Sequence, residues 1–166
     1  MGGDIQVESK IGKGSTFSFT IPYEPLKLKA NTKTDKKNTM NALLNKKLLI
    51  VEDDIVSREY LKEVFGLSEL EYEVTDSGKK AVELAQNKNF DIILMDIQLP
   101  DLNGLEATKN IRKFNKNIII IAQTAYAMDT DRIKCFEAGC NDYISKPIDM
   151  EALMKKIKNF FPDAND

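Results

Sequence analysis

The stretch Ile92-Ile93-Leu94-Met95-Asp96 decides the fold, because four consecutive apolar residues run directly into a carboxylate. A short, wholly apolar run that is followed by the Pro/Gly turn 99–104 predicts a strand buried on both faces. Asp96 would have no partner inside such a strand, so we place it at the carboxyl end, where open α/β sheets form ligand sites. A second run, Leu48-Leu49-Ile50-Val51, ends in the same way in Glu52-Asp53-Asp54. Two strands that both end in carboxylates indicate a cation site suited to phosphate chemistry.

Strand and helix patterns alternate five times from Lys46 onward. We expect strands over 47–51, 71–75, 91–95, 117–121 and 141–144, and helices over 55–66, 78–88, 104–113, 127–138 and 149–161. Asp54, Ser77 and Asp149 fit as helix N-caps, and Gly139 fits as the end of the fourth helix. Strict alternation predicts an α/β fold in which helices cover both faces of a parallel sheet through right-handed crossovers.

Two further segments precede this domain. Residues 1–23 contain two short alternating strands, 5–8 and 16–21, joined by a turn at Gly12-Lys13-Gly14, and are expected to form a β-hairpin. An isolated hairpin is marginal in water, so we interpret it as a remnant of a larger sheet. Residues 24–45 have the lysine-rich, aromatic-free composition of a linker, the main domain covers 46–162, and 163–166 form a tail.

The composition excludes several classes of function. With 42% hydrophobic and 30% charged residues and a net charge of -2, the chain is typical of a soluble globular protein with no general attraction to nucleic acid. The longest apolar run, 118–122, is too short to span a membrane, and no signal-peptide pattern follows Met1. There is no histidine to act as a base, nucleophile or ligand. Two cysteines, Cys135 and Cys140, favour buried thiols in a reducing cytoplasm.

The polar residues at the predicted strand ends suit magnesium. Mg²⁺ prefers hard oxygen ligands and keeps several waters, so one or two carboxylates and a phosphate oxygen satisfy it. Asp53 and Asp96 are the expected carboxylate ligands, the backbone carbonyl near Gln98 supplies a further oxygen, and Glu52 holds a metal-bound water.

The same edge of the sheet carries groups suited to phosphoryl transfer. The carboxylate of Asp96 can attack phosphorus and form an acyl phosphate. Lys146, which follows the fifth predicted strand, would neutralise the charge on the phosphoryl oxygens together with the metal. Thr124 follows the fourth strand and can donate a hydrogen bond to one of those oxygens.

At this point the sequence closely resembles the response-regulator receiver domain over residues 46–162. The resemblance rests on Val51–Asp54, Met95–Gly104, Thr124–Ala127 and Asp142–Pro147. It implies the five-stranded, CheY-like form of the flavodoxin-like fold, with strand order 2-1-3-4-5. It also implies that Asp96 is the phosphoacceptor, with the acidic pair Glu52 and Asp53, the switch residues Thr124 and Tyr143, the phosphate-binding Lys146, and a cis peptide before Pro147.

Residues 1–22 resemble a different segment, the end of a histidine-kinase ATP-binding domain. The phosphorylatable histidine, the metal-binding asparagine motif and the lid glycines of such kinases are missing. The resemblance therefore implies the tail of a hybrid sensor histidine kinase, with any membrane anchor upstream and no membrane contact by this fragment. The expected partner is the phosphohistidine domain of its own kinase or a histidine phosphotransfer protein.

The expected function is that of a phosphorelay receiver, which accepts a phosphoryl group on Asp96 with Mg²⁺ and passes it on or signals through a conformational switch. The fragment lacks a kinase active site but would catalyse its own phosphorylation. The alternative is a receiver that docks without being phosphorylated. A haloacid-dehalogenase-type phosphatase needs an acid where this chain has Gln98. The hairpin is expected to be mobile, to dock on the receiver, or to pair with a second copy in a homodimer.

Overall fold

The computed structural model describes residues 3–20, 45–67, 70–125 and 129–162. The chain divides into two compact units, Met1–Thr32 and Lys33–Asp166. The predicted linker, 24–45, and the tail, 163–166, lie almost wholly outside the described residues, so their extents stay predictions.

The smaller unit is the predicted hairpin. Strand β1 (Ile5–Lys10) pairs with β2 (Gly14–Phe19) in antiparallel register, with Ile5 opposite Phe19 and Val7 opposite Phe17. Gly12 and Gly14 have φ values of 77° and 93°, which explains why glycines flank Lys13 in this turn. Residues that alternate along two paired strands share a face, so Ile5, Val7, Phe17 and Phe19 form one exposed apolar face.

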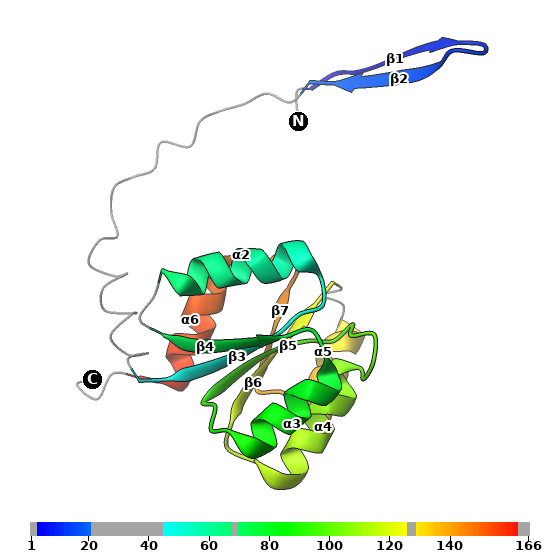
Figure 1. Ribbon diagram of the computed structural model, residues 1–166. Coiled ribbons are helices and arrows are strands. Elements are labelled where there is room, and N and C mark those ends of the chain that lie inside the picture. The colour runs from blue at the N-terminus through cyan, green and yellow to red at the C-terminus, as the bar shows by residue number, and fades with distance from the viewer. Residues whose placement is uncertain (1–2, 21–44, 68–69, 126–128, 163–166) are drawn as a thin grey trace. The chain divides into compact units, whose positions relative to one another are not determined.

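The larger unit is a parallel sheet in the order β4-β3-β5-β6-β7. The strands in chain order are β3 (Lys47–Val51), β4 (Glu71–Thr75), β5 (Ile92–Asp96), β6 (Ile119–Thr124) and β7 (Asp142–Ser145). Numbered within this domain, the order is 2-1-3-4-5, which confirms the predicted fold class (Figure 1). The central strands β3 and β5 are almost fully buried, as their uninterrupted apolar runs indicate.

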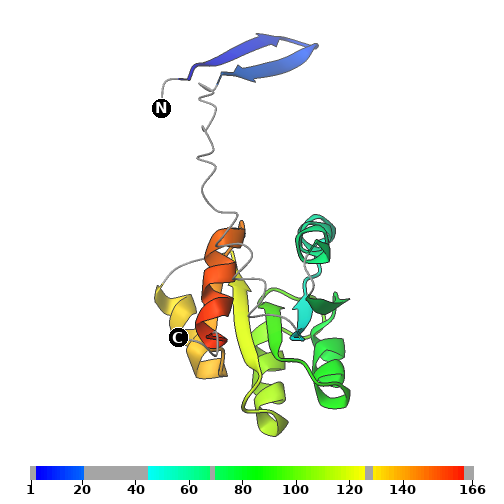
Figure 2. The same cartoon turned by 90° about the vertical axis from the view of Figure 1, so that its left-hand side faces the viewer.

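Helices cover both faces of the sheet (Figures 1 and 2). Apolar residues of α2 (Ile55–Gly66) and α6 (Met150–Phe160) pack on one face, around Leu48, Leu94 and Ile121. Those of α3 (Gly78–Asn87), α4 (Gly104–Phe114) and α5 (Asp129–Ala138) pack on the other, around Leu49 and Ile93. No helix in the described ranges combines the length and the hydropathy that a membrane crossing requires.

The helix ends are set by the residues that the sequence indicates. Asp54, Ser77 and Asp149 each accept a backbone N–H in the first turn of α2, α3 and α6, at 2.8, 3.0 and 2.9 Å. Gly139, with φ of 98°, ends α5, and the next residue, Cys140, donates its N–H to the carbonyl of Cys135 at 3.0 Å.

Three of the five strands lie further toward the carboxyl end than predicted, β5 and β7 by one residue and β6 by two residues at its start and three at its end. The side chain of Asn115 accepts the N–H groups of Asn117 and Ile118, both at 3.0 Å, so these residues are held in a turn and β6 begins only at Ile119. At the other end the ladder continues through the pair Thr124 and Ser145. Asp96 and Thr124 are therefore the last residues of β5 and β6 rather than residues after them.

Leu94→Ala tests the central position of β5. Leu94 is fully buried among α2, α6 and the neighbouring strands, so we expect the free energy of unfolding to fall by about 2–5 kcal/mol, measured by urea denaturation. Lys88→Ala, which removes only an exposed ion pair with Glu73, should cost about 1 kcal/mol or less. Similar losses in the two variants would contradict the assigned core.

Candidate functional site

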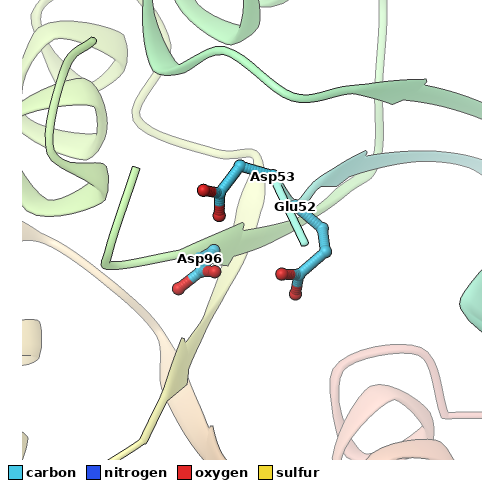
Figure 3. A group of neighbouring side chains, drawn as sticks. All are labelled: Glu52, Asp53 and Asp96. Atoms are coloured by element: carbon cyan, nitrogen blue, oxygen red, sulfur yellow. The ribbon is translucent and has the colours of Figure 1, made fainter. Parts of the chain in front are cut away.

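Three carboxylates converge where β3 and β5 end. Glu52 and Asp53 directly follow β3, and Asp96 ends β5, which lies beside β3 in parallel register. One carboxylate oxygen from each residue lies within 4.8 Å of the others (Figure 3). Parallel strands place their carboxyl ends at one edge of the sheet, so the fold brings together residues that are 44 positions apart in sequence.

Lys146 reaches the same edge from the far side of β6. It follows β7, and the peptide between Lys146 and Pro147 is cis, as the resemblance implied. The Nζ atom lies 2.6 Å from Asp96 Oδ2, and 2.9 and 2.8 Å from Glu52 Oε1 and Oε2. The lysine therefore bridges two carboxylates that come from neighbouring strands.

Burial makes the charged state of these groups unfavourable. Glu52 is 0% exposed and Asp96 3%, whereas Asp53 is exposed. Burial raises the pKa of Glu52; the hydrogen bond from Lys146 opposes this change, and the nearby Asp96 carboxylate adds to it. Burial alone would lower the pKa of Lys146, but its hydrogen bonds to Asp96 and Glu52 outweigh that effect and raise it. Lys146 thus stays charged, and the three acids outnumber it.

The other predicted site residues divide into two groups. Gln98 lies beside the carboxylates, and its N–H donates to Asp96 Oδ1 at 2.9 Å. Thr124 is nearly buried at the end of β6, and its carbonyl accepts the N–H of Lys146 at 2.8 Å. Tyr143, in contrast, is half-buried in β7, and its ring meets that of Phe136 in α5 edge-to-face at 6.4 Å between centroids. The structure therefore places Tyr143 against α5.

The sequence did not indicate Arg58, and it indicated Gly104 only as part of the turn 99–104. The Arg58 guanidinium donates to the carbonyls of Glu52 and Asp53, at 3.1 and 3.4 Å, and so fixes the backbone of the acidic pair. An arginine in the first turns of the helix after an acidic run was the available signal. A Cβ on Gly104 would overlap the carbonyl oxygen of Asp96, so this glycine is required for the loop after β5 to return to the strand end.

An open, doubly wound sheet with carboxylates and a lysine at one edge is the arrangement expected of the receiver class of two-component signalling proteins. In agreement, the family model of the response regulator receiver domain matches residues 48–158. The chain belongs to this family.

Two curated relatives show how the similarity is distributed. The hybrid signal transduction histidine kinase K of Dictyostelium discoideum is 32% identical over 161 residues, which cover 87% of this chain but only 13% of that kinase. The polar-differentiation response regulator DivK of Brucella ovis is 38% identical over 123 residues, covering 73% of this chain and all of DivK.

Two solved structures have the same fold. The receiver domain of the sensor histidine kinase PA1611 from Pseudomonas aeruginosa, with a magnesium ion in its active-site cleft, is 33% identical, with a TM-score of 0.65 over 71% of this chain and 98% of that one. The receiver domain of Ssk1 from Saccharomyces cerevisiae, solved with the histidine phosphotransfer protein Ypd1, is 34% identical, with a TM-score of 0.67 over 70% and 88%.

Lys146→Ala tests the charge balance of the site. The variant leaves Glu52 and Asp96 without their ammonium partner, so we expect it to lose about 1–3 kcal/mol of unfolding free energy at pH 7 in chelator. Because the pKa of Glu52 is already raised, its protonation should reduce this loss as the pH falls toward 5. Denaturation at both pH values, with Lys109→Ala as an exposed control, measures the effect. A loss of unfolding free energy that does not depend on pH would indicate that Lys146 stabilises the fold by packing instead.

Proposed function

We propose that Asp96 accepts a phosphoryl group from a phosphohistidine in a Mg²⁺-dependent reaction, and that this receiver then relays the group or signals through a conformational switch. The observation that carries the proposal is the contact of the buried Asp96 carboxylate with Lys146, next to Glu52 and Asp53. A nucleophilic oxygen, a fixed positive charge and spare acidic ligands are the components that phosphoryl transfer to a carboxylate needs.

The donor set fits magnesium. The oxygens of Glu52, Asp53 and Asp96 are hard ligands within 4.8 Å of one another, and they carry more negative charge than Lys146 neutralises. Asp53, Asp96 and the backbone carbonyl of Gln98 would hold the ion directly, and Glu52 would hold one of its waters. The ion, when bound, would neutralise charge that develops on the phosphoryl oxygens. The magnesium in the similar PA1611 receiver supports this assignment.

The chain's own residues have separate roles in the transfer. An Asp96 oxygen forms a bond to phosphorus while the nitrogen–phosphorus bond of the phosphohistidine breaks, and the departing imidazole keeps the electron pair and takes a proton from solvent. Lys146 exchanges its contact with the Asp96 carboxylate for the phosphoryl oxygens, and the Thr124 hydroxyl donates to one of them. These new contacts favour a second arrangement of the β6–α5 region, and Tyr143, packed on Phe136, reports it as the switch aromatic.

The partner would be a phosphohistidine domain, either of the parent kinase or of a separate phosphotransfer protein. The Ssk1 receiver, similar to this chain, forms such a complex with Ypd1. In this chain three exposed apolar side chains, Ile55, Val56 and Tyr60, lie on α2 immediately after the acidic residues 52–54. An apolar patch on the helix that follows the acidic pair suits a partner helix that presents its phosphohistidine over Asp96.

We further propose that residues 1–23 are the end of a kinase ATP-binding domain and that the parent is a hybrid histidine kinase. The match to the Dictyostelium kinase covers 87% of this chain, more than the receiver alone supplies, so it extends into the residues before 46. The exposed apolar face of the hairpin is the kind of surface that packs against another layer of a complete domain. The two free cysteines, both buried, agree with a cytoplasmic location.

Phosphorylation by a small donor tests the central proposal. Incubation with acetyl phosphate and Mg²⁺ should add one phosphoryl group, detected by intact mass, and a chelator should prevent it. Asp96→Asn should abolish the gain without unfolding the protein. Asp91→Asn, at the opposite end of β5, is the matched control and should be labelled normally. Continued labelling of the Asp96 variant would refute the assignment.

Self-association through the hairpin is tested by size in solution. With four apolar side chains exposed on one face, we expect the full chain to form dimers in light scattering as its concentration rises. Residues 24–166 and the double variant Phe17→Ser, Phe19→Ser should stay monomeric. A full chain that is monomeric at all concentrations would rule out pairing through this face.

A further inference from the structure

Asp101 lies in the loop 97–103, five residues beyond the phosphoacceptor, yet its carboxylate contacts a different element. It accepts hydrogen bonds from Ser77 Oγ at 2.6 Å, from the N–H of Gly78 at 2.9 Å and from the N–H of Lys79 at 3.2 Å. These three donors form the N-terminus of α3. The loop after β5 is therefore tied by a side chain to a helix on one face of the sheet.

The charges in the first turn of α3 favour the contact with the Asp101 carboxylate. Its first turn contains no acidic residue and instead has Lys79 and Lys80, so a carboxylate from outside complements both the helix dipole and the lysines. The hydrogen bond from Ser77 is the largest of the effects that hold the pKa of Asp101 well below its usual range, and the N–H groups of Gly78 and Lys79 add to it. Asp101 is therefore ionised at neutral pH.

Two backbone contacts also hold this loop. A Cβ on Gly78 would overlap the carbonyl oxygen of Leu102, so α3 and the loop are in direct backbone contact. The loop closes on itself through the N–H of Gly104, which donates to the carbonyl of Ile97 at 3.0 Å. Asp101 and Gly104 therefore hold the loop at its middle and at its end.

The loop 97–103 includes Gln98, whose N–H donates to Asp96 Oδ1 at 2.9 Å. We propose that Asp101 is a positioning residue for the metal and phosphoryl site, because it ties the loop 97–103 to α3 and so holds the Gln98 backbone against Asp96. This inference rests on the proposed function for the role of the Gln98 carbonyl as a metal ligand, but the orientation of Asp96 by the Gln98 N–H stands independently of it.

Asp101→Ala tests the proposal in the full chain. It should raise the Mg²⁺ concentration for half-maximal labelling by acetyl phosphate about tenfold, the effect typical of losing an outer support of a metal ligand. Asp101→Asn should recover part of the loss, since its amide oxygen still accepts from Ser77 and Gly78. Glu83→Gly is the matched control: it weakens α3 at an exposed position away from the loop, and should lower the melting temperature while leaving the Mg²⁺ dependence unchanged.

A second readout needs neither metal nor phosphodonor. The Gln98 amide resonance in ¹⁵N NMR should shift and exchange faster with solvent in Asp101→Ala but stay unchanged in Glu83→Gly. An unchanged Gln98 amide in Asp101→Ala, or an equal change in both variants, would overturn the positioning role. Wild-type protein that takes no label while the Gln98 amide still responds to Asp101→Ala would refute the proposed function and leave the positioning role intact.

Discussion

The site depends on one constraint: two buried carboxylates at adjacent strand ends need a positive partner. Glu52 and Asp96 meet because β3 and β5 are parallel neighbours, and such proximity is unfavourable without compensation. Lys146 supplies it from β7, two strands away from β5, at distances below 3 Å to both acids. The strand order and the length of the lysine side chain bring these charges together. The exposed Asp53 adds negative charge beyond what Lys146 neutralises, so the group suits a cation.

Much of this could be predicted from the sequence, for definite physical reasons. The apolar runs that end in Val51 and Met95 indicate buried strands, and the acids that follow them are most easily placed at the strand ends. The hairpin and the N-caps follow from local chemistry. The sequence placed Lys146 at the same edge of the sheet, but it did not predict the contact of Lys146 with Glu52, 94 residues away. Spacing alone does not encode how far a side chain reaches across a sheet.

Other features depended on tertiary contacts that no local pattern reveals. The late start of β6 follows from the Asn115 side chain, which holds the preceding residues in a turn. The interaction of Asp101 with the start of α3 joins segments that are 23 residues apart, and a Pro-Asp pair in a turn otherwise indicates only the turn itself. Arg58 likewise resembles an ordinary exposed helix residue until the fold places it under the backbone of the acidic pair.

The backbone hydrogen bond from the Lys146 N–H to the Thr124 carbonyl links the two residues directly. Under the proposed function, a displacement of Lys146 toward a phosphoryl group would also act on the end of β6, to which Thr124 belongs. The proposed movements of Thr124 and Lys146 would then be coupled rather than independent. Coupled movements of this kind would favour two discrete arrangements of each molecule, and a graded response would come from the fraction of molecules in each arrangement.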